Sequence, residues 1–133
     1  MGDDESLFQK EVKMPDLAKV FKSFGYAFKG IVSLFRYENN AKVHLIAGIL
    51  AVAAAFYLEF SLIEWCILVI QIALVLAAEA FNTAIEKLCD VISPGKHPVI
   101  GTVKDIAAGA VLITAIAAVI TGLSLFLPKI LQL

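Results

Sequence analysis

Three long apolar segments dominate this sequence, at residues 43–58, at 63–78 with an extension to residue 89, and at 106–127. A hydrocarbon core ~30 Å thick is crossed by about 20 residues of helix, so the segments have roughly the length of membrane spans. Apolar residues make up 60% of the chain and the mean hydropathy is +0.87, far from the usual balance of a soluble protein. We therefore predict an all-α integral membrane protein with three transmembrane helices.

The N-terminal part divides into two segments of different character. Residues 1–15 are charged and lack an apolar core, so we expect a polar tail and not a secretory signal. Asp16 is a candidate N-cap, and from Leu17 the apolar positions follow helical spacing, while lysines and other polar residues fill another face. This pattern predicts an amphipathic helix over residues 16–36 that lies in the membrane interface. Residues 16–133 would then form one domain.

The basic residues predict the orientation of the spans. Three spans place ten of the eleven Lys and Arg residues on one side of the membrane and leave Lys129 alone on the other. The positive-inside rule therefore places the N-terminus and the loop between the second and third spans in the cytoplasm. No run of like charges suggests nucleic-acid binding.

A column of polar residues continues the second apolar segment. Its members follow one another at helical spacing: Glu79, Asn82, Glu86 and Asp90. This spacing places all four on one helix face about 16 Å long. The predicted orientation brings further polar residues toward the same side of the membrane: Glu38, Asn39, Lys42, Lys104 and Asp105. Ionisable groups at membrane depth are rarely kept for packing, so we expect a functional site at this cytoplasmic face.

These residue types suit phosphoryl transfer, which uses metal ions, a cation near the phosphates and a base. Glu38 and Glu86 could supply the oxygen ligands that Mg²⁺ prefers, and Lys104 could face the phosphates. Glu79 lies deeper in apolar surroundings than Asp90, which makes it the better candidate for proton transfer. The residues alone leave three classes open: an enzyme, a proton or ion carrier, and a structural subunit.

A carrier would need acidic residues that continue across the membrane. Between Glu79 and Glu64 the second span offers only Gln71 as a polar relay, and this gap argues against a carrier. Three spans are also too few to enclose a large cavity, so a deep site would need neighbouring copies of the chain. We therefore expect a homo-oligomer.

Three stretches of the sequence resemble one known family. They are FGYAFKGIVSLFRYENN at 24–40, AEAFNTAIEKLCD at 78–90 and KDIAAGAVL at 104–112. In this combination the chain resembles, over residues 19–127, the small prokaryotic diacylglycerol kinase family, which includes diacylglycerol kinases and undecaprenol kinases. The resemblance implies a homotrimer in the bacterial plasma membrane. It also implies ATP and Mg²⁺ dependence, with sites at the cytoplasmic interface built from neighbouring subunits.

The resemblance further implies roles for individual residues. Glu79 matches the family's proposed catalytic base, and Glu38 and Glu86 match its metal-binding carboxylates. The other matching positions lie around the nucleotide: Lys19, Lys22, Tyr26, Asn82, Asp90, Lys104 and Asp105. Together with Glu38 and Glu86, these residues form the expected binding site for ATP and its metal ion.

Two positions favour one branch of the family. His44 and Ala108 look more like the undecaprenol kinase branch, because the diacylglycerol kinase branch typically has an acidic residue and a serine there. We therefore predict phosphorylation of undecaprenol to undecaprenyl phosphate, with phosphorylation of diacylglycerol to phosphatidic acid as the alternative. Taken by itself, His44 is interpreted as an ordinary residue of the membrane border.

Overall fold

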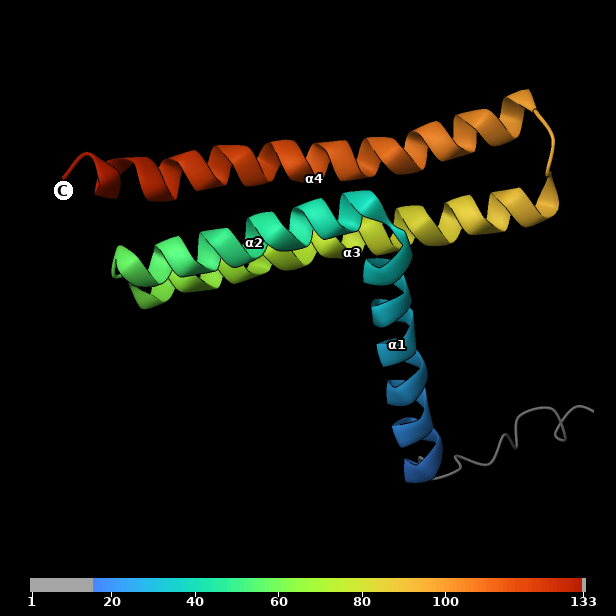
Figure 1. Cartoon of the computed structure of the whole chain (residues 1–133), viewed down its shortest axis with the longest axis horizontal. Helices are drawn as coiled ribbons and strands as arrows, with labels where there is room; N and C mark the ends of the chain where they lie inside the picture. The colour runs from blue at the N-terminus through green and yellow to red at the C-terminus, as the bar shows by residue number, and fades with distance from the viewer. Residues whose placement is uncertain (1–15, 133) are drawn as a thin grey trace, which may run out of the picture. The chain divides into compact units, whose positions relative to one another are not determined.

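The computed structural model describes residues 16–132, and within this range every regular element is a helix. In chain order the helices are α1 (Leu17–Tyr37), α2 (Asn39–Tyr57), α3 (Leu62–Ile92) and α4 (Pro98–Ile130) (Figure 1). By length and composition, α2, α3 and α4 can each cross a membrane. The prediction of an all-α protein with three such helices is confirmed. The expected polar tail, residues 1–15, lies outside the described residues.

Helix α1 begins at the predicted cap. The Asp16 Oδ1 atom accepts hydrogen bonds from the backbone N–H groups of Ala18 at 3.1 Å and Lys19 at 3.4 Å. The chain divides into two compact units, with the first ending at Val32 inside α1. All described residues of this first unit are exposed, apolar and basic alike. Its location in a membrane interface stays a prediction.

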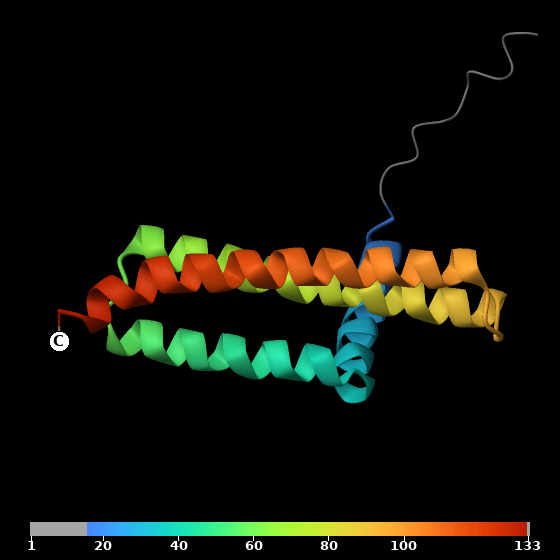
Figure 2. The same ribbon diagram turned by 90° about the horizontal axis from the view of Figure 1, so that it is seen from above.

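Helices α2, α3 and α4 belong to the second unit and run side by side (Figures 1 and 2). A single extended residue, Glu38, precedes the first residue of α2. Between α3 and α4, the Gln71 Nε2 group donates a hydrogen bond of 3.2 Å to the backbone oxygen of Thr114. Side-chain hydrogen bonds of this kind hold helices together inside membranes, where apolar contacts alone supply little preference for one partner.

The short turn between α2 and α3 is fixed by a cap and by the end of α4. Ser61 forms a capping box with Glu64, in which each side chain accepts a hydrogen bond from the other residue's backbone N–H. Lys129 of α4 places its Nζ atom 3.2 Å from Glu64 Oε2. The Phe60 ring is buried and lies 4.8 Å from the ring of Phe126, measured between centroids. These contacts fix the start of α3.

The opposite connection is shorter than the sequence suggested. The apolar pattern placed the third span at 106–127, but α4 begins at Pro98, and α3 continues past Cys89 to Ile92. Proline suits the first position of a helix because the N–H that it lacks would have no partner there. Hydropathy marks only the part of a helix that lies in hydrocarbon. It therefore does not detect the polar helical turns at the end of α3 and at the start of α4.

The extra turns carry the polar residues beyond the apolar zone. With 31 and 33 residues, α3 and α4 are about 46 and 50 Å long, against a hydrocarbon core of ~30 Å. They extend together past the start of α2 (Figure 1). Asp90 and Lys104 lie in contact with each other on this extended part, where water-soluble ligands can reach them. Glu86 lies about level with the start of α2, since the neighbouring Lys87 contacts Glu38.

Candidate active site

The polar column of α3 runs from a buried end to an exposed end. Glu79 is only 2% exposed and Asn82 9%, Glu86 is half-buried, and Asp90 is exposed. Thr83, which the sequence analysis did not single out, is also buried beside Asn82. One helix face therefore leads from solvent to a carboxyl group that is almost fully enclosed.

His44 of α2 lies beside Glu79. Its Nε2 atom lies 3.2 Å from Glu79 Oε1, although the two groups are not aligned for a hydrogen bond. Among the described residues, neither Glu79 Oε1 nor the buried Oδ1 atom of Asn82 has a hydrogen-bond donor. A buried polar atom without a partner is costly, and such atoms at a site indicate a missing ligand or water. The buried end of the column can thus accept a proton or hydrogen bond from a bound molecule.

Two further carboxylates lie near this end of the column. Asn82 Nδ2 donates a hydrogen bond of 3.4 Å to Glu86 Oε1, and Glu38 accepts one of 3.0 Å from Lys87 Nζ. Both Glu38 and Glu86 are close enough to Glu79 for electrostatic interaction with its carboxyl group. Three acidic side chains are thereby gathered from the start of α2 and the middle of α3.

The exposed end of the column meets the start of α4. Lys104 Nζ lies 2.9 Å from Asp90 Oδ1, which ties the two helices together across their connection. A polar pocket of about 540 Å³ opens beside this pair. It is lined by Asp90, Ser93, Pro94, Gly95, Lys96, His97, Pro98, Ile100, Gly101 and Lys104. The pocket combines basic and hydrogen-bonding groups at the water-accessible end of the site.

The donor atoms suit a magnesium ion that takes part of its coordination from a ligand. Among the described residues, no group of three His, Cys, Asp or Glu side chains could hold a metal ion. Glu38 and Glu86 nevertheless offer carboxylate oxygens, and Asn82 offers an unpartnered amide oxygen. Mg²⁺ is commonly held by one or two carboxylates together with phosphate oxygens and water. Lys87 and the ion would then compete for the Glu38 carboxylate, whose Oε1 atom contacts Lys87.

The remaining predicted residues are not brought into these contacts. Lys19, Lys22 and Tyr26 lie on α1 within the first unit, and all three side chains are exposed. Asp105 is exposed near the start of α4. Their part in nucleotide binding stays a prediction.

Two residues in the contacts were not among the predicted site residues. The sequence places His44 at the membrane border as an ordinary residue and gives no role to Lys87. The spacing of Glu38, Ala41 and His44 is a signal that was available, since residues three apart share a helix face. Ala41 is fully buried, so this face points inward. Lys87 has no such signal, because its contact depends on where α2 begins relative to α3.

Comparison with known proteins decides between the classes that the residues left open. A family model described as prokaryotic diacylglycerol kinase matches residues 25–126, most of the chain. The chain belongs to this family. The resemblance predicted from the sequence is therefore confirmed, and the protein is a lipid kinase.

Three relatives of this chain carry two different names. Undecaprenol kinase of Bacillus subtilis is 40% identical over 86% of this chain and 94% of the relative. Diacylglycerol kinase of Synechocystis is 38% identical over 84% of this chain, but the match covers 64% of the longer relative. Diacylglycerol kinase of Escherichia coli is 35% identical over 77% of this chain and 84% of the relative.

Proposed function

We propose that the protein transfers the γ-phosphate of ATP to the terminal hydroxyl of undecaprenol in a Mg²⁺-dependent reaction. The observation that carries this proposal is the buried Glu79, whose Oε1 atom has no hydrogen-bond donor among the described residues. A general base must lie within hydrogen-bond reach of the proton it removes. A hydroxyl that enters beside Glu79 would supply the missing donor.

In the proposed reaction the lipid oxygen bonds to the γ-phosphorus as the bond between that phosphorus and the leaving oxygen of ADP breaks. The hydroxyl proton passes to the Glu79 carboxylate. His44, 3.2 Å away, holds this carboxylate in place on the α2 side. Mg²⁺ bound by Glu38 and Glu86 would neutralise charge on the phosphate oxygens. Burial of Glu79 keeps competing water from the reacting hydroxyl.

The nucleotide would lie toward the exposed end of the column. Lys104 and the polar pocket beside it offer a cation and hydrogen-bonding groups to the phosphates. Asp90 holds the Lys104 ammonium, and Asp105 would complete this end of the site. Asn82 would face the phosphates from the buried end of the column. Lys19, Lys22 and Tyr26 of α1 would contact the nucleotide from the surface helix.

The proposal includes a cytoplasmic site in a homotrimer of the bacterial plasma membrane. The charge distribution supports this orientation, since Lys129 is the only basic residue expected outside. A need for neighbouring subunits agrees with the small number of carboxylates that one chain gathers. Many large apolar side chains are exposed on the single chain, and neighbouring copies or lipid would cover them.

Similarity to the Bacillus subtilis relative favours undecaprenol over diacylglycerol as the substrate. That protein is named an undecaprenol kinase, and the match covers nearly the whole of both chains. The relatives named diacylglycerol kinase are only slightly more distant, which makes diacylglycerol the second candidate substrate.

The test is a transfer assay with both lipids in parallel. Purified protein in lipid vesicles receives ATP labelled at the γ-phosphate, Mg²⁺, and either undecaprenol or dioleoylglycerol. We expect preferential labelling of undecaprenol and none with Glu86→Ala. Preferential labelling of dioleoylglycerol would keep the reaction and replace the substrate. A folded protein that labels neither lipid would contradict the proposal.

A further inference from the structure

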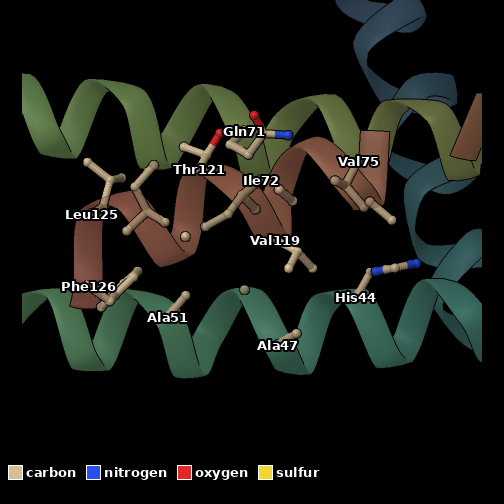
Figure 3. A pocket seen from close by; sticks show the side chains of 15 residues that line it. His44, Ala47, Ala51, Gln71, Ile72, Val75, Val119, Thr121, Leu125 and Phe126 are labelled. Atoms are coloured by element: carbon tan, nitrogen blue, oxygen red, sulfur yellow. The ribbon is translucent and has the colours of Figure 1, made fainter. Parts of the chain in front are cut away.

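A cavity of about 280 Å³ lies between α2, α3 and α4 (Figure 3). Its walls are mostly apolar, and the α2 and α4 walls are made largely of small residues, among them Ala47, Gly48, Ala118 and Gly122. The only polar side chains that line it are His44, Gln71 and Thr121. The Nε2 group of Gln71 is already bound to the backbone of α4. The cavity therefore offers little to a polar ligand.

One end of the cavity lies next to His44, the neighbour of the buried Glu79. His44 lines this end, and its Nε2 atom lies 3.2 Å from Glu79 Oε1. Phe126 lies at the opposite end in Figure 3. On α2 the lining runs from His44 to Ala51, about 10 Å along the helix. A molecule in the cavity would thus extend from beside Glu79 toward the other side of the membrane.

The membrane limits what can occupy this space. All three walls belong to helices that can cross a membrane, where water is scarce and hydrocarbon is the solvent. An α-helix with its side chains is about 10–12 Å across, too wide for a cavity of about 280 Å³. A single hydrocarbon chain is narrow and apolar enough to fit.

We infer that this cavity binds the part of the lipid alcohol's hydrocarbon chain nearest the hydroxyl, with His44 between the chain and Glu79. This inference rests on the proposed function, because it assumes that the hydroxyl reacts beside Glu79. The inference adds a binding site for the lipid's hydrocarbon chain inside one protomer. The lipid would be selected by its chain as well as by its hydroxyl.

The small residues of α4 allow the cavity to be filled without a clash. A Cβ atom added at Gly122 meets nothing within 4 Å, so a larger side chain there has room to extend into the cavity. Gly48 is unsuitable, since its added Cβ would lie 3.3 Å from Ile72 Cγ2. Ala118 lines the cavity, whereas the neighbouring Ala117 is exposed and does not. Ala118→Leu and Ala117→Leu are therefore a matched pair.

The kinetic test compares long and short alcohols: undecaprenol with prenol, whose single isoprene unit would fill only a small part of the cavity, and dioleoylglycerol with dibutyrylglycerol. We expect Ala118→Leu and Gly122→Leu to lower kcat/KM for the long alcohol about tenfold relative to the short one. The KM for ATP should stay at the parent value in all three variants. In Ala117→Leu, the ratio of kcat/KM for the long alcohol to kcat/KM for the short alcohol should also stay at the parent value. Equal ratios in Ala118→Leu, Gly122→Leu and Ala117→Leu would overturn the inference.

A second readout needs no catalysis. Ala118→Cys and Ala117→Cys are made in a chain whose Cys66 and Cys89 are replaced by alanine, and alkylation by a membrane-permeant thiol reagent is timed. Undecaprenol should slow the reaction at Ala118→Cys only. Protection there without phosphoryl transfer to any lipid would contradict the proposed function and keep the binding site. Phosphoryl transfer without protection would keep the proposed function and contradict the binding site. Loss of the oligomer in Ala118→Leu with unchanged lipid kinetics would also contradict the binding site, since a second copy would then fill the cavity.

Discussion

At the scale of single residues, the carboxyl group of Glu79 combines burial with the lack of a hydrogen-bond donor within the described chain. Spacing along one helix was enough to predict that Glu79 and Asn82 share a helix face, because that property depends only on helical periodicity. The contact with His44 depends on how α2 lies against α3. No pattern within one helix contains that information, so His44 was assigned to the membrane border.

His44 is expected to position Glu79 for catalysis. His44→Leu removes the imidazole whose Nε2 atom lies 3.2 Å from Glu79 Oε1. We expect kcat to fall about tenfold to a hundredfold, as misplaced catalytic groups typically cause, while the KM for ATP changes little. Steady-state kinetics in lipid vesicles would measure both values. His44→Gln, which keeps an N–H group at this position, should recover part of kcat, and a parent-like kcat in His44→Leu would exclude this positioning role.

Lys87 is expected to compete with Mg²⁺ for Glu38. Its Nζ atom lies 3.0 Å from Glu38 Oε1 across α2 and α3. Partly exposed pairs of this kind contribute about 0.2–1 kcal/mol. Lys87→Met should therefore lower the Mg²⁺ concentration for half-maximal activity by up to about fivefold.

A titration of activity with Mg²⁺ tests this prediction. Lys129→Met removes the same charge at the opposite end of the bundle, where the lysine contacts Glu64, and should leave the Mg²⁺ requirement unchanged. An unchanged or higher requirement in Lys87→Met would show that Glu38 does not bind the ion.

At the scale of elements, the ends of α3 decide where the site residues lie. The apolar pattern was sufficient to predict a helix there, but it ended the second span at Cys89 and began the third at Ile106. The polar turns up to Ile92 and from Pro98 are helical because local capping and intrahelical hydrogen bonds continue without apolar side chains. Hydropathy cannot detect them, and so it placed Lys104 in a loop instead of on α4.

The capping box at Ser61 is expected to stabilise the start of α3. Ser61→Ala removes the oxygen that accepts from the Glu64 N–H, and loss of such a cap typically costs about 1 kcal/mol. We expect a lower melting temperature in detergent with normal phosphoryl transfer at low temperature, because the cap is far from Glu79. Ser124→Ala is the control, since Ser124 is exposed and bonds only within α4. Equal melting temperatures for the two variants would contradict this role of the cap.

At the scale of the whole molecule, we propose that neighbouring copies of the chain complete the site. The described residues of one chain bring together Glu38, Glu79 and Glu86, but no three-residue metal group. The need for neighbouring copies was predicted from chain length and the number of spans. Which copy supplies each side chain depends on packing between chains, and a sequence holds no local pattern for it.

The orientation proposed from the basic residues can be measured with introduced cysteines. In a chain with Cys66→Ala and Cys89→Ala, Gly95→Cys lies in the α3–α4 connection and Gln132→Cys lies past the end of α4. Both positions are exposed, and a Cβ at Gly95 meets nothing within 4 Å. A membrane-impermeant maleimide should label Gln132→Cys in intact spheroplasts and Gly95→Cys only after permeabilisation. The opposite pattern would place the site outside.

The most direct test of the account concerns Glu79 itself. Glu79→Gln keeps the shape of the side chain but cannot accept the hydroxyl proton as a carboxylate does. Transfer of labelled γ-phosphate to undecaprenol would be measured together with nucleotide binding in the same vesicles. We predict a loss of turnover of about a hundredfold or more with nearly unchanged nucleotide affinity. Turnover equal to the parent's would show that Glu79 is not the base and that the site has been assigned to the wrong residue.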